Sequence, residues 1–260
     1  MLRGLLSALG IYKLYHRWLR YQIKSGKKPE HIAVILDGNR RWASLHDLEG
    51  GTGHPQGAEK VEEFLKWCLD LDIKTVTLYV FSTENFQRPK KEVEEIMKLA
   101  EVYLQRIMKD ETIHRYRVRI KALGRLSMLP ESLQQMIRSV EEQTKDYDRF
   151  YLNVAIAYGG RAEIIDATRE IAREVAEGEI HLENIDESLF EKHLYTSHLP
   201  QQDPDLIIRT SGESRLSGFL LWQSAYSELF FMDVYWPDFR KIDLERAIRT
   251  FGKRGRRLGK

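Results

Sequence analysis

The chain has 260 residues, a net charge of +2 and one cysteine, Cys68. This length allows one α/β domain with a large core, and the balanced charge argues against a general nucleic-acid-binding protein. The lone cysteine excludes an intramolecular disulfide and every multi-cysteine metal site, which fits a reducing compartment and a cytoplasmic location. No stretch of about 20 apolar residues is present, so the sequence predicts no transmembrane helix.

Residues 1–28 form a basic segment that we separate from the main domain, residues 29–260. The segment contains Lys and Arg but neither Asp nor Glu. Two stripes recur at helical spacing, one basic and one aromatic or apolar: Lys13, Arg17, Arg20 and Lys24, and Tyr12, Tyr15, Leu19 and Ile23. A basic amphipathic helix of this kind is typical of a segment that makes a peripheral contact with an anionic membrane. The alternative is that the helix packs on the main domain.

The main domain alternates short β-branched runs with helical patterns. The runs predict strands at 31–36, 75–81, 117–123, 150–157 and 205–209. Apolar residues at helical spacing predict helices over 61–69, 93–108, 130–145, 160–177 and 186–195. This order favours an α/β fold with a mainly parallel sheet and helices on both faces, whose ligands bind where the strands end.

Polar side chains follow the first predicted strand in HIAVILDGNRRWA (31–43). Asp37 comes directly after the apolar run, and Gly38 allows close approach of the backbone to a ligand. Arg40 and Arg41 add guanidinium groups, which suit phosphate. The stretch therefore predicts a site for a metal ion and a phosphate.

Two later segments should reach the same edge of the sheet. FSTENFQRP (81–89) follows the second strand, although Ser82, Thr83 and Asn85 are also ordinary turn and capping residues. IIRTSGESRLSGFLLWQSAYSE (207–228) offers arginines, hydroxyls and a glycine that suit a diphosphate, with solvated loop as the alternative. Glu228 at its end lies in an apolar context, where an acid needs a partner or a metal.

These segments together resemble the cis-prenyltransferases, the undecaprenyl diphosphate synthase family. The resemblance rests on HIAVILDGNRRWA, on GH and GAEK around His54, and on TLYVFSTENFQRP, LNVAIAYGGRAEI, DLIIRTSGESRLSGFLLWQSAYSELFF and WPDF. It covers roughly residues 29–259 in order. The double arginine and the long basic N-terminus are more similar to archaeal or eukaryotic members than to the common bacterial ones.

The resemblance implies a single α/β domain whose parallel sheet is flanked by helices that enclose a hydrophobic tunnel, working as a homodimer. It also implies the reaction: isopentenyl diphosphate units are condensed in cis onto an allylic prenyl diphosphate, with Mg²⁺, to make a long, undecaprenyl-like polyprenyl diphosphate for lipid glycosyl carriers. The apolar faces at 61–69 and 93–108 would line the tunnel, or would be plain core. Product length and the primer, farnesyl or geranylgeranyl diphosphate, stay open.

The resemblance also assigns roles to individual residues. Asp37 and Glu228 would hold Mg²⁺, Asp37 would also act on the departing diphosphate, and Asn85 would help to remove a proton. The residues implied to bind substrate form three groups: Gly38, Asn39, Arg40, Arg41, Trp42 and His54 at the allylic substrate; Ser82, Thr83, Glu84, Phe86 and Arg88 near the reacting carbons; and Arg209, Arg215 and Ser217 at isopentenyl diphosphate. The C-terminal RRLG (256–259) would reach toward a partner subunit, or would be a frayed tail.

The chain departs from the family pattern at two positions. Gly50 stands where an arginine is usual, and Phe86 stands where a tryptophan is usual. A non-catalytic partner subunit of the same fold would lack the acid found here as Asp37. A phosphatase with an aspartate nucleophile would need a second aspartate in place of Asn39, so both alternatives fit the sequence less well.

Overall fold

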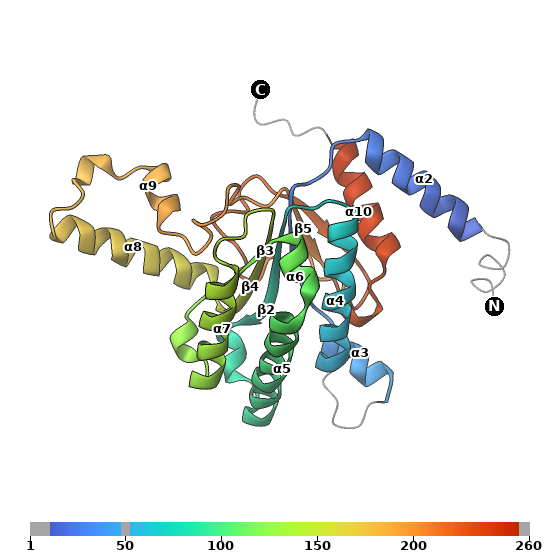
Figure 1. The fold of residues 1–260 in the computed structure, drawn as a ribbon, viewed down its shortest axis with the longest axis horizontal. Coiled ribbons are helices and arrows are strands. Elements are labelled where there is room, and N and C mark those ends of the chain that lie inside the picture. The colour runs from blue at the N-terminus through green and yellow to red at the C-terminus, as the bar shows by residue number, and fades with distance from the viewer. Residues whose placement is uncertain (1–10, 48–52, 255–260) are drawn as a thin grey trace.

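A computed structural model of the chain describes residues 11–47 and 53–254, and Figure 1 shows a central sheet with helices packed against it. The sheet has six strands in the order β3-β4-β2-β1-β5-β6, and every neighbouring pair is parallel. The strands are β1 (His31–Ile35), β2 (Thr75–Ser82), β3 (Val118–Leu123), β4 (Phe150–Tyr158), β5 (Leu206–Arg209) and β6 (Glu228–Phe231). The predicted α/β fold and five predicted strands are confirmed, while the short β6 was missed.

Helices cover the sheet unequally. The α-helices of the described residues are α2 (Ile11–Ser25), α3 (Asn39–Leu45), α4 (His54–Asp70), α5 (Lys90–Lys109), α6 (Glu111–Tyr116), α7 (Glu131–Thr144), α8 (Gly160–Ala176), α9 (Glu187–Lys192) and α10 (Lys241–Lys253). Helices α4, α5, α7 and α10 pack over one face, which we call the helix face. The α8–α9 segment projects from the other side of the molecule (Figure 1). The helix predicted over 186–195 is only the short α9.

The side chains of each strand alternate between the two faces of the sheet. Ile32 and Val34 of β1 pack on the helix face with Phe64 of α4. Ala33 and Ile35 point to the opposite face, where a segment after β5 covers them with apolar side chains, including Phe219 and Leu220. The expectation of helices on both faces is therefore only partly met, because a turn-rich segment forms much of the second layer.

The N-terminal helix α2 packs on the domain through the stripe that we expected to face a membrane. Leu19 and Ile23 are buried, and Ile23 joins the core of the helix face. Arg20 Nε lies 3.3 Å from Glu245 Oε1 of α10, and the Arg249 guanidinium lies over the Trp18 ring. The expected orientation is thus wrong, because α10 offers this stripe an apolar partner that the sequence did not reveal.

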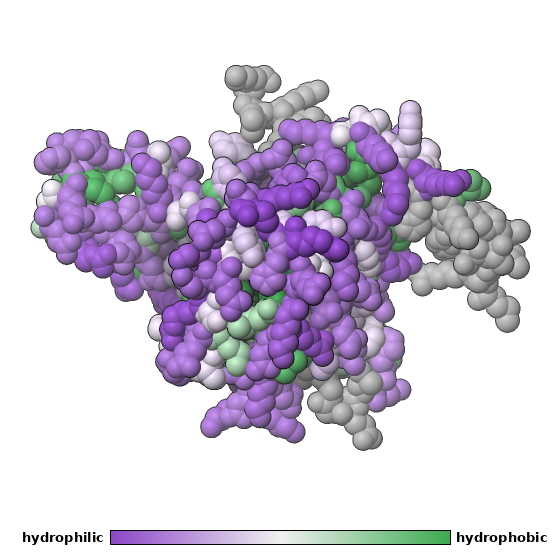
Figure 2. All heavy atoms as spheres, viewed as in Figure 1, coloured by the Kyte–Doolittle hydropathy of each residue, from purple (hydrophilic) through white to green (hydrophobic). Residues whose placement is uncertain are grey.

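The surface in Figure 2 is mostly hydrophilic, with small hydrophobic areas such as the one over the α8–α9 segment. Leu182 and Ile185 are exposed in that segment. Within residues 11–47 and 53–254, no helix is long and apolar enough to cross a bilayer.

Candidate active site

Asp37 lies just beyond the carboxyl end of β1, between two arginines. Arg209 Nη2 donates to Asp37 Oδ2 at 2.7 Å, and Arg41 Nη2 lies 3.3 Å from Asp37 Oδ1. Although partial burial raises the pKa of Asp37, the hydrogen bond and charge of Arg209 hold it below its ordinary value. The carboxylate is therefore ionised at neutral pH, as a ligand of a cation must be.

The backbone beneath Asp37 is fixed by Thr210, which follows β5. The Thr210 hydroxyl donates to Asp37 O at 2.7 Å and accepts from Asp37 N at 3.0 Å. Gly38 has a φ of +105°, and a Cβ there would lie 2.6 Å from the Tyr235 ring. The chain can turn this tightly after Asp37 only because residue 38 is glycine.

Arg209 joins this corner to the loop after β5. Its Nη1 donates to Ser217 Oγ at 2.7 Å and to the backbone carbonyl of Arg215. Parallel pairing explains the meeting, since Ile35 and Arg209 are register partners at the ends of their strands. The two segments that the sequence predicted at one edge are thus held together by one guanidinium.

The carboxylate of Glu92 contacts a second set of basic groups, which follow Asp37 in the chain. The carboxylate is 7% exposed, and its Oε1 lies 3.1 Å from Arg88 Nη1 and 3.4 Å from His54 Nε2. Arg40 Nε lies 3.9 Å from the same oxygen. Burial and the charges of Arg88 and Arg40 lower the pKa of His54 despite Glu92, so the imidazole is neutral at pH 7.

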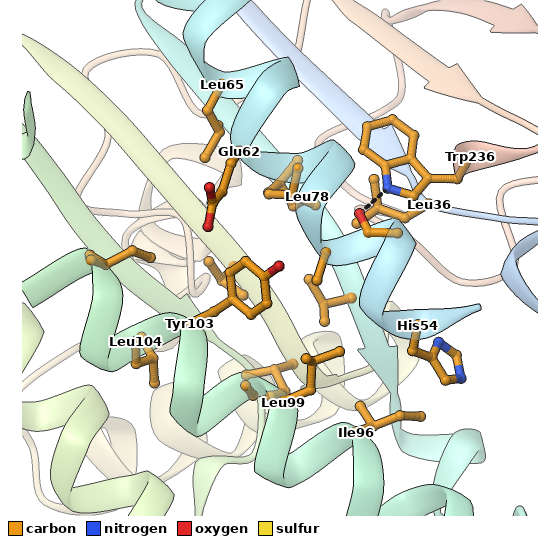
Figure 3. A pocket seen from close by; sticks show the side chains of 18 of the residues that line it. Leu36, His54, Glu62, Leu65, Leu78, Ile96, Leu99, Tyr103, Leu104 and Trp236 are labelled. Carbon is orange, nitrogen blue, oxygen red and sulfur yellow. Dashed lines mark hydrogen bonds between the residues drawn. The ribbon is translucent and has the colours of Figure 1, made fainter. Parts of the chain in front are cut away.

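An apolar pocket of about 900 Å³ opens from these charged groups into the helix face. It lies between the sheet and helices α4, α5 and α7, and Figure 3 shows side chains of α4 and α5 pointing into it across from Leu78. Val80 of the central strand β2 is 37% exposed because it faces this space. The Trp236 indole donates to Gly57 O at 2.7 Å near the mouth (Figure 3).

The arrangement suits a ligand with a charged head and a long apolar tail. Arg40, Arg41, Arg88 and His54 line the mouth together with Asp37, and apolar side chains continue inward. Such cation clusters bind phosphate groups, and apolar walls bind hydrocarbon.

Comparisons with known proteins agree with this geometry. A family model described as putative undecaprenyl diphosphate synthase matches residues 35–259. The chain belongs to this family, the cis-prenyltransferases. Two relatives are named tritrans,polycis-undecaprenyl-diphosphate synthase (geranylgeranyl-diphosphate specific). The one from Methanocaldococcus jannaschii is 53% identical, over 96% of this chain and 90% of that protein. The one from Methanopyrus kandleri is 54% identical, over 96% and 92%.

Solved structures show the same fold. Lavandulyl diphosphate synthase from Lavandula x intermedia, crystallised with dimethylallyl diphosphate, has a TM-score of 0.85 at 36% identity and covers 90% of this chain and 99% of its own. A probable undecaprenyl diphosphate synthase from Campylobacter jejuni has a TM-score of 0.72 at 34% identity, over 90% and 100%. The enzyme is thus a cis-prenyltransferase that elongates prenyl chains.

The FSTENFQRP segment lies at the same edge of the sheet. Ser82 ends β2, and residues 83–87 form a 3₁₀ turn. Asn85 Oδ1 accepts a hydrogen bond from Ser82 N at 3.1 Å, and the Phe86 ring packs edge-on against Phe81. The capping interpretation of Ser82 and Asn85 is therefore correct, and the catalytic role implied for Asn85 stays a prediction.

The side chains of two residues implied to bind substrate contact other groups of the protein. Trp42 stacks on His46 at 4.2 Å and does not line the pocket. Arg215 is 63% exposed and pairs with Glu213, beside the site but turned toward solvent. Gly50 and the RRLG segment lie outside the described residues.

Glu228 does not meet Asp37 within the chain. It begins β6 and is the register partner of Leu206, which begins β5, whereas Asp37 follows the opposite ends of the strands. Its Oε2 lies 2.8 Å from Arg254 Nη1 instead. Glu228 therefore has an ionic partner within the chain, and the magnesium role implied for it stays a prediction.

Several groups at the site were missed by the sequence analysis. These are Glu92, Thr210, Glu213 and Tyr235. Only Glu92 carried a signal, since it lies four residues after Arg88 at the start of a helix. Ser211 Oγ accepts from Arg41 Nη2 at 2.6 Å, a contact between distant segments that only the fold reveals.

Proposed function

We propose that the enzyme condenses isopentenyl diphosphate units in cis onto geranylgeranyl diphosphate, with Mg²⁺, to make a long, undecaprenyl-like polyprenyl diphosphate for lipid glycosyl carriers. The observation that carries the proposal is the Asp37 corner, with its two arginines, at the mouth of a long apolar pocket. The primer and the product class follow the names of the archaeal relatives.

The donor set fits Mg²⁺. In the described residues no group of three or more His, Cys, Asp and Glu side chains could hold a metal ion, so Asp37 would act with phosphate oxygens of the substrate. Asn39 Oδ1, two residues away, is buried and has no hydrogen-bond partner in the protein, which leaves an oxygen free for ligand or water. The bound ion would withdraw charge from the diphosphate as the allylic C–O bond breaks.

The residues of the chain supply the rest of the chemistry. Arg41 and Arg209 would stabilise the diphosphate that leaves the allylic carbon, because fixed cations act most strongly in a site that excludes water. Arg209 and Ser217 would hold isopentenyl diphosphate beside it. The alkene of that substrate forms the new C–C bond and then loses a proton, for which Asn85 remains the proposed helper.

The assay is direct. Labelled isopentenyl diphosphate is incubated with the protein, Mg²⁺ and primers of different length, and the products are sized. We expect products far longer than the primer, most with geranylgeranyl diphosphate, and none after EDTA treatment. Single-unit products, or full activity in EDTA, would contradict the proposal.

We also propose that the enzyme is a homodimer. β6 is the edge strand of the sheet, and Leu229, Phe231 and the nearby Tyr226 expose apolar surface there. A strand edge with exposed apolar side chains suits association. Light scattering should give twice the monomer mass, and Phe231→Asp should lower it.

We also propose that α2 makes a peripheral membrane contact, through a different face from the one expected from the sequence. Leu14, Trp18 and Tyr21 are exposed at helical spacing, and the exposed basic residues Arg17 and Lys24 flank them. Flotation with phosphatidylglycerol vesicles should recover the protein, and Leu14→Glu should reduce recovery while Leu182→Glu, at another exposed leucine, should not. Equal recovery of both variants would contradict this contact.

A further inference from the structure

The loop between β5 and β6, residues 210–227, has a concentration of strained backbone. Seven non-glycine residues of the described chain have a positive φ, and three of them lie in this loop: Ser211 (+78°), Ser217 (+50°) and Leu220 (+45°). Residues other than glycine adopt this left-handed region rarely, because the Cβ crowds the backbone. They persist there only where the surrounding structure holds them. The contacts that hold the loop are therefore of interest.

Ser217 is held by three elements of the fold. Arg209 Nη1, at the end of β5, donates to Ser217 Oγ at 2.7 Å. The Tyr79 hydroxyl, from β2, donates to the backbone carbonyl Ser217 O at 3.3 Å. At the start of α8, Gly160 N donates to Gly218 O at 2.8 Å. Ser217 is nevertheless exposed, so a fixed residue faces the space in which a substrate would bind.

Tyr79 and Arg209 reach Ser217 from one row of the sheet. Ile35 of β1 is the register partner of Tyr79 on one side and of Arg209 on the other. Side chains of one register row point to the same face of a parallel sheet. The two side chains therefore approach Ser217 together, one at its hydroxyl and one at its backbone. The resemblance implies a role for Arg209 but none for Tyr79.

The Tyr79 side chain is itself fixed by packing. It is 8% exposed, and its ring stacks on Phe219 with centroids 4.7 Å apart and 8° between the planes. Phe219 lies two residues after Ser217, so the ring and the hydroxyl contact the same loop at two points. Burial and the charge of Glu84 raise the pKa of Tyr79 to about 12, against the opposing charge of Arg209. The hydroxyl therefore keeps its proton at neutral pH and can donate it.

We propose that Tyr79 is a positioning residue for isopentenyl diphosphate, because its hydroxyl keeps Ser217 in the left-handed conformation that presents Ser217 Oγ beside Arg209. This inference rests on the proposed function, in which Arg209 and Ser217 hold that substrate. Without the hydroxyl, the backbone of Ser217 relaxes toward the ordinary regions and its Oγ leaves Arg209. Since Tyr79 acts through Ser217, its loss weakens the binding of isopentenyl diphosphate and not that of the allylic primer.

Removal of the hydroxyl tests this role while the ring stays in place. In Tyr79→Phe, KM for isopentenyl diphosphate should rise roughly 3- to 10-fold, the range expected for one hydrogen bond, and KM for geranylgeranyl diphosphate should change about twofold or less. A merely structural role would lower the free energy of unfolding without changing the ratio of the two KM values. Tyr195→Phe is the matched control, because the Tyr195 hydroxyl donates to Asp166 Oδ2 at 2.6 Å instead of to the loop. It should leave the ratio unchanged.

A second variant strains the same backbone without removing a contact. Gly218 has a φ of +79°, and a Cβ added there has no atom beyond its chain neighbours within 4 Å, so Gly218→Ala opposes the loop conformation without a clash. Gly178→Ala, just after α8, is the matched control, with a φ of +76° and equally open space. Both variants should lower the free energy of unfolding by similar amounts. Only Gly218→Ala should raise KM for isopentenyl diphosphate several-fold relative to KM for the primer.

The ratio of the two KM values decides the outcome. An unchanged ratio in Tyr79→Phe or in Gly218→Ala, with urea unfolding showing a folded protein, would overturn the positioning role and leave the proposed function in place. An equal change of the ratio in either control variant would overturn it as well, because the effect would then not depend on Ser217. No condensation by the wild type would overturn the proposed function and this role with it.

Discussion

The two faces of the sheet are filled in opposite ways. On the helix face, α4 and α5 stand far enough from β2 to leave the pocket of about 900 Å³, and Val80 is partly exposed to it. On the opposite face, Tyr79 of the same strand stacks on Phe219 with ring centroids 4.7 Å apart. One strand thus borders open space on one side and close packing on the other.

The opposite face also contains a network of buried polar groups. Glu163 is 1% exposed and accepts hydrogen bonds from Tyr158 Oη at 2.5 Å, Tyr195 N at 2.9 Å and Gln223 Nε2 at 3.1 Å. Burial raises its pKa above the ordinary value. The hydrogen bonds of such a network favour one arrangement of its groups.

A second chain of polar contacts crosses three strands near their amino ends. His31 Nε2 lies 2.8 Å from Thr77 Oγ1, which accepts from Asn153 Nδ2 at 3.0 Å, and His198 Nε2 lies 2.9 Å from Asn153 Oδ1. The Tyr79 hydroxyl, on the same face, donates to Ser217 O at 3.3 Å. The Tyr79–Ser217 hydrogen bond ties the loop after β5 to the opposite face, while the helix face keeps the open space of the pocket.

Two acids, Asp37 at the site and Glu163 on the opposite face, should give the largest contrast. Replacing the first should lower activity, and replacing the second should lower stability. Asp37→Ala should lower kcat by at least about 10³, because loss of one well-placed electrostatic group costs about 10²–10³ and Asp37 is proposed to act on both metal and diphosphate. Glu163→Leu should instead lower the free energy of unfolding by about 1–3 kcal/mol or more, since it leaves buried donors without an acceptor. Kinetics and urea unfolding of both variants measure the contrast. Near wild-type turnover in Asp37→Ala would contradict the assignment of the site.

Arg209, at the end of β5, and Arg215, in the loop after it, should differ as well. Arg209 contacts both Asp37 and Ser217, so Arg209→Ala should raise KM for both diphosphate substrates and lower kcat by roughly 10²-fold. Arg215 is largely exposed and turned toward solvent, so Arg215→Ala should leave kcat nearly unchanged and raise KM for isopentenyl diphosphate only slightly. Steady-state kinetics with each substrate varied in turn separate these outcomes. Equal effects of both variants would show that Arg215 turns into the site when substrate binds.

Sequence reasoning predicted the parts of the molecule that depend on local pattern. Buried strands and amphipathic helices follow from side-chain periodicity, and ligand groups at strand ends follow from parallel pairing. The sequence could not reveal that one guanidinium, that of Arg209, joins Asp37 to the loop 172 residues away. It also could not show that α10 covers Leu19 and Ile23, because amphipathic stripes look alike whether they face a membrane or a neighbouring helix.

Lowering the pH should reduce the free energy of unfolding through two histidines on the opposite face. Burial lowers the pKa of His31 and His198 from 6.5 to about 4. The unfolded chain therefore binds protons at these residues below pH 6.5 while the folded protein does not, so stability is complete above pH 6.5 and falls as the pH approaches 4. Each histidine contributes at most about 3 kcal/mol. Urea unfolding from pH 7 to 4.5 should show this loss, and His198→Gln should reduce it. His181→Gln, at an exposed histidine, should not change the slope.

Added volume should be tolerated on one face and resisted on the other. Val80→Phe places a ring in the pocket, so we expect little loss in the free energy of unfolding and shorter products. Ala155 of β4 is fully buried on the opposite face, and Ala155→Val should cost about 1–3 kcal/mol through overpacking, although it adds less volume. Urea unfolding and product sizing of both variants test this. A Val80→Phe protein that is the less stable of the two would show that the pocket closes when no chain occupies it, and the contrast between the faces would then exist only in the bound enzyme.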